Sequence, residues 1–213
     1  IDYVSGSGTN SLTFTYTVQA GDTSADLDYV ATSSLALNSG TIKDAANNNA
    51  TLTLASPAAS NSLGANKAII IDTTAPTQTI SAIDISADTG ISATDFITAT
   101  AAQTITGALS ANLGFGESLW GSVNGGVSYT NISSSVTGTA ISWAGATLSG
   151  TSSIKFEVRD AAGNVGTAAT QNYELDTTAP TQTISGIDIS TDTGSSATDF
   201  LTSTASQTIT GTL

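Results

Sequence analysis

Short runs in which apolar and polar residues alternate recur along the whole chain. Residues 12–18 read Leu-Thr-Phe-Thr-Tyr-Thr-Val, and in residues 154–159 apolar residues alternate with charged ones. A period of two is that of a strand with one buried face. Clusters of Gly, Asn, Asp and Ser separate the runs, and no helical apolar stripe of useful length is present. The pattern predicts an all-β protein of antiparallel sandwiches.

A long internal repeat sets the predicted domain organisation. Residues 72–107 and 176–211 lie 104 residues apart and differ at six of 36 positions. This period is the size of one sandwich domain and indicates a tandem, linear array. We predict a partial domain over residues 1–72 that lacks its opening strands, a complete domain over 73–175, and the first strands of a further domain over 176–213.

Seven strands are predicted within the complete domain. Turns at residues 124–126 and 160–164 fit two of the connections. Trp120 is expected to lie in the core, whereas the pattern leaves the place of Trp143 open. The strands are expected at residues 77–87, 103–109, 119–123, 127–132, 140–143, 153–159 and 167–175.

The composition excludes several classes of function. The 213-residue chain has no Cys and no His, so it forms no zinc finger, thiol nucleophile or Ser–His–Asp triad. It carries 4 basic and 17 acidic residues, a net charge of −13. So few cations cannot neutralise a nucleic-acid backbone. No apolar run of about 18 residues exists, so no membrane span is predicted.

Three motifs resemble a known class of repeat. They are Asp-Thr-Thr-Ala-Pro-Thr at 72–77, the Asp-Thr-Gly and Ser-Ala-Thr-Asp-Phe elements within 84–98, and Arg-Asp-Ala-Ala-Gly-Asn at 159–164. Together they resemble the bacterial immunoglobulin-like repeats of giant secreted adhesins, and residues 6–72 resemble a second repeat type of those proteins. The resemblance implies a non-enzymatic, surface-anchored rod of tandem immunoglobulin-like domains, often stiffened by Ca²⁺ at the junctions. One departure is the run Asn47-Asn48-Asn49, which stands where Gly is expected in the turn of the first unit, so that turn is expected to differ in shape.

Acidic residues gather at the predicted ends of the domains without cations to pair with them. Two unit charges about 4 Å apart interact by about 4 kcal/mol at an effective dielectric near 20, so such a cluster would separate the domains or raise a pKa. Ca²⁺ removes this cost because it takes about six to eight oxygen ligands in flexible geometry. We predict one junction site from Asp44, Asp72, Asp160 and Asn164, with Asn47 as a further candidate, a second site from Asp88, Asp95 and Asp176, and copies of the second pair at Asp192 and Asp199.

Plain turn chemistry is the alternative for each of these residues, because Asp and Asn often bond their own backbone. A further acidic segment, residues 22–28, has the spacing of a Ca²⁺ loop but lacks the Gly and the distal Glu of an EF-hand. We interpret it as a solvated loop.

The predicted function is a structural rod segment of a secreted bacterial cell-surface adhesin. Its partners would be neighbouring repeats of the same or an adjacent chain, with any cell-surface or glycan receptor bound by other regions. An enzyme is not expected, because the paired Asp residues recur once per repeat, as joints do and catalytic sites seldom do. Three alternatives are kept: strand donation from residues 176–213 to residues 1–72 of the next chain, ice binding by Thr-x-Thr arrays, and a glycan-binding module. The candidate stacking residues for glycans are Trp120, Tyr129, Trp143 and Tyr173.

Overall fold

The structure is a computed structural model that describes all residues, 1–213. The chain forms two compact units, Ile1–Leu175 and Asp176–Leu213. Helical structure is confined to α1 (Leu63–Asn66) and a 3-10 turn at Ser133–Ser135. Neither is long and apolar enough to cross a membrane. The predicted all-β class is therefore confirmed.

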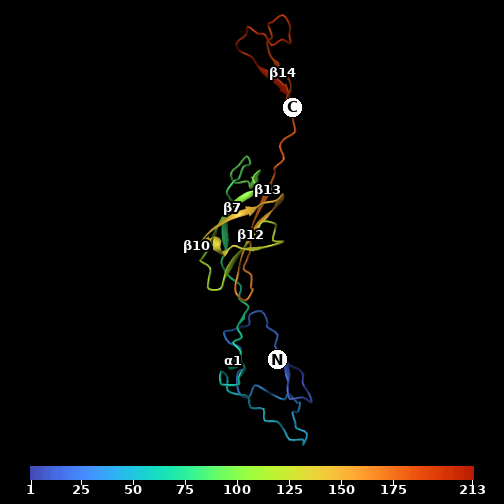
Figure 1. Cartoon of the computed structure of the whole chain (residues 1–213), viewed down its shortest axis with the longest axis vertical. Coiled ribbons are helices and arrows are strands. Elements are labelled where there is room, and N and C mark those ends of the chain that lie inside the picture. Colours follow the sequence, from blue (N-terminus) through green and yellow to red (C-terminus); the bar gives the residue numbers. More distant parts are fainter. The chain divides into compact units, whose positions relative to one another are not determined.

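Two sheets pack face to face in the first unit (Figure 1). A four-stranded sheet has the order β10-β11-β7-β5, and a five-stranded sheet has the order β6-β13-β12-β8-β9. All their pairings are antiparallel except the parallel pair β13–β6. The strands are β5 (Ile80–Ile85), β6 (Ile97–Thr98), β7 (Ala102–Leu109), β8 (Ser118–Ser122), β9 (Thr130–Asn131), β10 (Val136–Thr137), β11 (Ala140–Thr147), β12 (Thr151–Arg159) and β13 (Ala169–Leu175). This arrangement is consistent with a β-sandwich.

The core lies between these sheets and follows from the alternation. On β12, Ile154, Phe156 and Val158 are buried, and on β7, Ile105 and Leu109 are buried. Side chains of successive strand residues point to opposite faces, so the residues between them point away from the core. Burying a side chain of this size stabilises a fold by about 1.5–3 kcal/mol relative to exposure. The apolar half of the pattern therefore holds the two sheets together.

A buried glutamine closes the connection from β5 to β7. Gln103 is only 3% exposed. Its Oε1 accepts hydrogen bonds from Ser86 Oγ (3.0 Å) and from the Ala87 N–H (2.9 Å). Its Nε2 donates to the carbonyls of Ala87 (3.1 Å) and Thr100 (2.7 Å). One side chain thus provides hydrogen-bond partners for backbone groups of Ala87 and Thr100, near the two ends of this connection.

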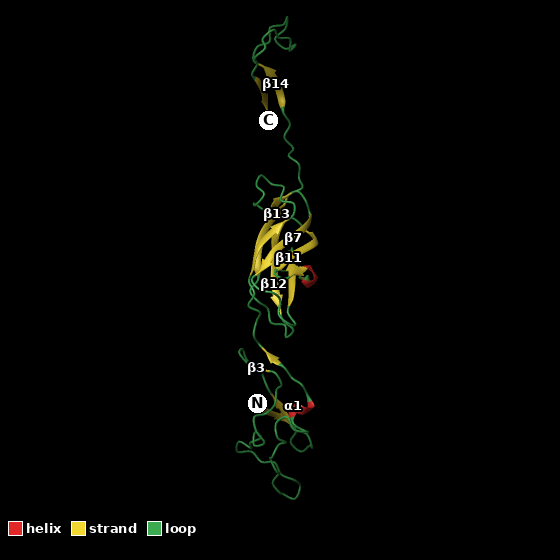
Figure 2. Cartoon of the chain, turned by 90° about the vertical axis from the view of Figure 1, so that its left-hand side faces the viewer, coloured by secondary structure: helices red, strands yellow, loops and turns green.

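Residues 1–72 contain little regular structure (Figure 2). Ser62 is their single buried residue, and large apolar side chains such as Tyr3 and Phe14 are about half exposed, at 51% and 43%. Ser62 caps α1 by accepting a hydrogen bond from the Ala65 N–H (3.1 Å). The predicted partial domain stays a prediction here. The strands are β1 (Asp2–Ser5), β2 (Thr13–Thr15), β3 (Thr23–Ser24) and β4 (Ile71–Asp72), paired β1–β2 and β3–β4.

The second unit repeats the local structure of residues 80–109. Its strands β14 (Ser185–Ile189) and β15 (Ile209–Thr212) pair antiparallel, as β5 and β7 do. Both pairs have a register irregularity at the same place, where Ala82 has a φ of +50° and Gly186 a φ of +56°. Gln207 makes the hydrogen bonds that correspond to those of Gln103. Its partners are Ser190 and the backbone of Thr191 and Thr204. No residue of this unit is buried, so these bonds form without a core.

Candidate functional site

Asp160 opens the turn between β12 and β13, and its carboxylate organises that turn. Oδ1 accepts a hydrogen bond from the Asn164 backbone N–H (2.8 Å), and Oδ2 accepts one from the Asn164 side-chain amide (2.8 Å). The Asp160 N–H donates to the Asn164 carbonyl (3.1 Å), and Gly163 takes a left-handed φ of +91°. The Asn164 amide also donates to the backbone carbonyl of Asp72 (3.0 Å). Asn164 therefore links the turn to the segment that precedes β5.

The turn at Asp44 has the same hydrogen bonds. Asp44 accepts from the backbone N–H and the side-chain amide of Asn48, both at 2.8 Å, and its own N–H donates to the Asn48 carbonyl (3.0 Å). Asn47 takes a φ of +73° where Gly163 takes +91°. It does so because Asn, after Gly, most readily visits the left-handed region. The expected difference in turn shape was wrong, and Asn48 rather than Asn47 corresponds to Asn164.

These bonds favour the charged form of both carboxylates. The side-chain bond from Asn164 is the largest cause that lowers the pKa of Asp160 below 3.8, and the side-chain bond from Asn48 does the same for the pKa of Asp44. A pKa that is lower in the folded chain than in the unfolded chain stabilises the fold above the unfolded value. That contribution is lost as the pH falls through the folded pKa. The hydrogen bonds of each turn therefore add stability to the fold above the ordinary pKa of Asp.

Asp88 and Asp95 lie in the loop between β5 and β6. Asp88 Oδ2 accepts from the Phe96 N–H (3.0 Å), and Asp95 accepts from the N–H groups of Ile97 (3.0 Å) and Ser92 (3.1 Å). The bond from Ile97 is the largest cause that lowers the pKa of Asp95. Phe96 has a φ of +60°, a strained conformation for a bulky residue. Asp88 Oδ1 is buried and has no hydrogen-bond partner.

The same loop recurs 104 residues later. Asp192 Oδ2 accepts from the Phe200 N–H (3.0 Å), and Asp199 accepts from the N–H groups of Leu201 (3.1 Å) and Ser196 (3.3 Å). Phe200 has a φ of +57°, within a few degrees of its counterpart. The sequence repeat is thus a repeat of hydrogen bonds and of backbone strain.

No group of three or more acidic side chains lies close enough to hold an ion. Asp44 lines a groove with Tyr3 and Phe14, whereas Asp72 pairs with Thr23 in β3. The backbone carbonyl of Asp72 accepts the bond from the Asp160 turn. The Asp72 carboxylate accepts instead from the Thr74 N–H (2.9 Å). The predicted site at this junction stays a prediction.

Asp176 belongs to the second unit and has the same local role as Asp72. Its Oδ1 accepts from the Thr178 N–H (2.8 Å). The predicted site that combines Asp176 with residues of the first unit also stays a prediction, as does the calcium ion itself.

The acidic residues between 22 and 28 make separate local contacts. Asp22 Oδ2 accepts from the Tyr16 hydroxyl (2.8 Å) and the Gln19 N–H (2.9 Å). These bonds lower the pKa of Asp22, the bond from Gln19 being the largest cause. Asp28 Oδ2 accepts from the Ala58 N–H (3.0 Å), which is the largest cause that lowers its pKa. Each carboxylate therefore fixes its own stretch of backbone.

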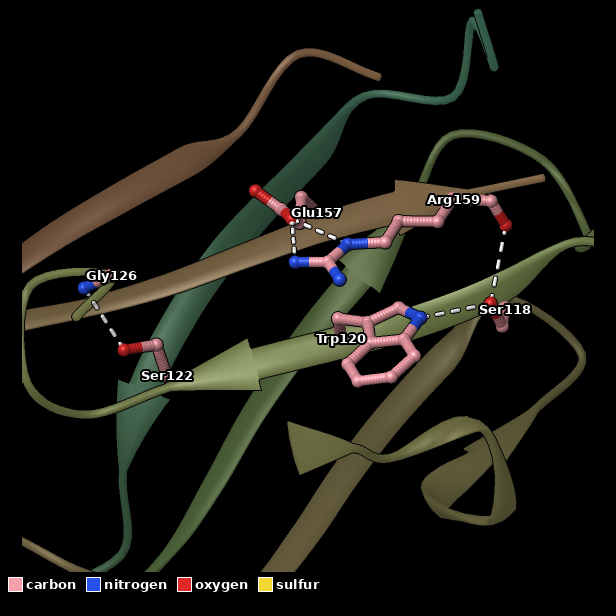
Figure 3. Close-up of polar contacts among 6 residues, drawn as sticks. All are labelled: Ser118, Trp120, Ser122, Gly126, Glu157 and Arg159. Carbon is pink, nitrogen blue, oxygen red and sulfur yellow. Dashed lines mark hydrogen bonds and ion pairs between the residues drawn. The ribbon is translucent and has the colours of Figure 1, made fainter. Parts of the chain in front are cut away.

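A second group of polar side chains lies on the outer face of the five-stranded sheet (Figure 3). On β8, Leu119 and Gly121 are buried, so Trp120 between them points outward. On β12, Glu157 lies directly opposite Trp120, and Arg159 follows two residues later on the same face. This pairing brings an aromatic ring and a charged pair together.

Trp143 lies against the core and Trp120 lies outside it, whereas the sequence predicted Trp120 in the core and left the place of Trp143 open. Trp143 packs on the core, with its ring centroid 6.1 Å from that of Phe156. A Cβ atom on Gly121 would lie 2.8 Å from Trp143 Cζ3, so Gly121 leaves the room that this indole fills. Trp120 is only partly buried and lies outside the core. The expectation for Trp120 was wrong because the small Gly121 occupies the inward position of β8.

Arg159 is held by charge and by two aromatic rings. Its Nε and Nη2 donate to Glu157 Oε1, at 2.7 and 2.5 Å. Its guanidinium carbon lies 4.4 Å from the centroid of the Trp120 ring and 5.0 Å from that of the Tyr129 ring. Trp120 Nε1 donates to Ser118 Oγ (2.9 Å). Burial is the largest cause that raises the pKa of Tyr129.

The pairing with Arg159 explains how Glu157 can be only 7% exposed, since a buried charge is costly unless it is paired. Sequence reasoning did not single out this pair, although Arg159 is the single arginine of the chain. Its position on the polar side of an alternating strand was the available signal.

Comparisons with known proteins provide no identification. No model of a protein family, no curated protein and no solved structure matches the chain. The case for a function therefore depends on the repeated loop and on the sequence motifs.

Proposed function

We propose that the chain is a structural segment of a bacterial surface adhesin, located outside the cell, in which successive immunoglobulin-like sandwiches form a rod. The observation that carries the proposal is the loop of Asp88 and Asp95, whose hydrogen bonds recur at Asp192 and Asp199. Features that recur once per repeat are typical of linear arrays, in which each unit contacts its neighbours. The resemblance of the sequence motifs to adhesin repeats supports the same function.

Calcium is the ion proposed to stiffen this rod. Asp88 Oδ1 is a buried oxygen without a donor, and a hard cation would satisfy it. Asp88 and Asp95 would supply carboxylate oxygens to this ion, whereas Asp160 and Asn164, beside the Asp72 carbonyl, would belong to a separate junction site. A bound ion would supply positive charge to a chain of net charge −13. The hydrogen bonds described above would orient the carboxylates toward it.

Calcium is expected to raise the melting temperature of the sandwich. A ligand at 100 times its Kd stabilises the folded state by about 2.7 kcal/mol. For a domain of about 100 residues this corresponds to an increase of roughly 10 °C. Differential scanning calorimetry of the full chain in 2 mM CaCl₂ and in EDTA measures the difference.

A matched pair of variants locates the effect. Asp88→Asn with Asp95→Asn is expected to abolish the calcium-dependent increase, whereas Asp192→Asn with Asp199→Asn leaves the melting of the sandwich unchanged. An identical melting temperature of the unmodified chain in calcium and in chelator would show the calcium proposal to be wrong.

Assembly of copies by strand donation is a second candidate function, favoured by the exposure of the second unit. Ile209 is 71% exposed and Leu213 is 85% exposed. Their counterparts Ile105 and Leu109, which lie under the facing sheet, are 0% and 4% exposed. Covering such apolar area is favourable at about 25 cal/mol per Å².

Strand donation predicts self-association that depends on this face. Light scattering after size exclusion is expected to show a mass that rises with concentration, and Ile209→Asp is expected to reduce that rise. A chain that stays monomeric at millimolar concentration would contradict strand donation.

A further inference from the structure

The segment that leads into the sandwich, residues 72–76, is hydrogen-bonded to residues that precede it. Thr73 Oγ1 accepts a hydrogen bond from the Gly21 N–H (2.9 Å) and donates one to the Asp22 carbonyl (3.0 Å). Asp72, the last residue of β4, pairs with β3 beside this contact. One hydroxyl therefore provides partners for a donor and an acceptor of a turn that begins 52 residues earlier in the chain.

The same segment is also held by the sandwich that follows. The Asp72 carbonyl accepts a hydrogen bond from the Asn164 side-chain amide (3.0 Å). Pro76 is buried, and a Cβ atom on Gly166 would lie only 2.8 Å from the Pro76 carbonyl oxygen. A side chain at residue 166 would therefore displace the proline. Proline fixes its own φ and restricts the residue before it, so contacts on both sides leave the segment few ways to bend.

An identical segment later in the chain makes different contacts. Residues 176–180 have the same sequence as residues 72–76, Asp-Thr-Thr-Ala-Pro. Thr177 and Pro180 are exposed, whereas their counterparts in the earlier segment are half-buried and buried. Since the two segments are chemically identical, the difference comes from their neighbours. The exposed copy is therefore an internal control for the bonded one.

We propose that residues 72–76 form a joint that fixes the direction of the rod without calcium, with Thr73 as the contact on one side and Asn164 as the contact on the other. This inference rests on the proposed function, because stiffness matters in a rod. The contacts use a hydroxyl, an amide nitrogen and backbone groups, so they need no ion.

The composition of the joint also favours stiffness. Flexible linkers are rich in Gly and Ser, and residues 72–76 contain neither. Each hydrogen bond contributes modestly alone, because folding exchanges it for a bond to water. Bonds on both sides of a segment that contains proline act together, because rotation of either neighbour breaks at least one of them.

The test measures how widely the sandwich moves relative to the preceding residues, in EDTA so that no ion contributes. The chain has no cysteine, so Ala25→Cys and Val127→Cys, at two exposed positions, place one spin label on each side of the joint. Double electron–electron resonance on the full chain gives the distribution of distances between the labels. A single narrow distribution is expected. Thr73→Val removes the hydroxyl but keeps the shape of the side chain, and it is expected to widen the distribution roughly twofold.

Matched variants locate the effect. Thr177→Val makes the same change in the exposed copy and is expected to leave the width unchanged. Thr73→Ser keeps a hydroxyl and is expected to retain the narrow distribution. Asn164→Ala is expected to widen it as Thr73→Val does. Its control is Asn48→Ala, which removes the equivalent side-chain bond from the turn at residues 44–48 and is expected to change nothing at the joint.

Amide hydrogen exchange gives a second readout that does not depend on the labels. The Gly21 N–H has the Thr73 hydroxyl as its acceptor, so Thr73→Val is expected to speed exchange at Gly21 about fivefold. Thr177→Val is expected to leave this rate unchanged. Thermal melts confirm that each variant is folded.

Three results would overturn the proposal. They are a distribution in the unmodified chain that is as wide as in Thr73→Val, equal widening by Thr177→Val, and a wide distribution in EDTA that narrows in CaCl₂. The first result would leave the rod with a flexible linker, and the last would assign the joint to the ion. The calcium proposal is tested separately by the melting temperatures described above, so either proposal can fail without the other.

Discussion

Replacing Phe156 with alanine is expected to lower the free energy of unfolding of the sandwich by about 4 kcal/mol, because large-to-small changes at buried aromatic sites lose both transfer energy and packing. Phe156 is 0% exposed and packs against Trp143. It lies on β12, which pairs with both β8 and β13. Chemical denaturation followed by near-ultraviolet circular dichroism measures the loss.

Phe115 provides the matched control for this substitution. It is fully exposed, at 111% of the reference area, in the connection between β7 and β8. Phe115→Ala removes the same atoms but no buried contact, so a change within about 0.5 kcal/mol is expected. If the two variants were equally stable, Phe156 would not be a core residue of the folded chain.

Replacing Gln103 with leucine is expected to destabilise the sandwich by about 2–3 kcal/mol, because each buried polar group left without a partner costs about 1–3 kcal/mol. The side chain is 3% exposed and joins Ser86 and Ala87 to Thr100. Leucine has a similar volume, so the loss reports the hydrogen bonds rather than a cavity. Loss of the bonds is also expected to speed amide exchange at Ala87.

The repeat supplies a control for Gln103 within the same molecule. Gln207→Leu removes the equivalent hydrogen bonds from the second unit, which has no core beneath them. The unfolding of the sandwich is expected to change by less than about 0.5 kcal/mol. An equal effect of the two substitutions would mean that the buried position of Gln103 contributes nothing.

The strands of the sandwich could be predicted from the sequence because their alternation is strong. The run around Phe156 and the run that begins at Ala140 lie within observed strands β12 and β11. Short strands were missed: β6 has two residues and no alternation of its own. It forms because the parallel pairing with Glu174 and Leu175 of β13 is available in three dimensions.

The directions of the two tryptophans could not be predicted with the same success. Both lie in strands, and either could have filled the core. The decision comes from the register of β8, in which Gly121 faces inward and leaves a gap for Trp143. A glycine between Trp120 and Ser122 suggests a weak strand residue in the sequence, whereas in the fold it leaves the room that a large side chain fills.

Turn chemistry was predictable in kind and not in detail. The Asp and Asn residues do bond backbone groups in turns, as their types suggest. The left-handed conformation of Asn47 agrees with its residue type, because Asn adopts a positive φ readily. The positive φ of Phe96 does not follow from its residue type, and the bond from its N–H to Asp88 holds it.

The near-identity of residues 72–107 and 176–211 creates a hazard while the chain is being made. Each segment carries the strand pattern that can complete residues 110–175, and tandem domains commonly misassemble by exchanging such segments. Ribosomes add about 5–20 residues per second, so the duplicate segment takes roughly 2–7 s to emerge after the sandwich has been completed at residue 175. Sandwich domains fold in milliseconds to seconds. The correct segment is therefore in place before its duplicate leaves the ribosome, and the order of synthesis protects the repeat from its own copy.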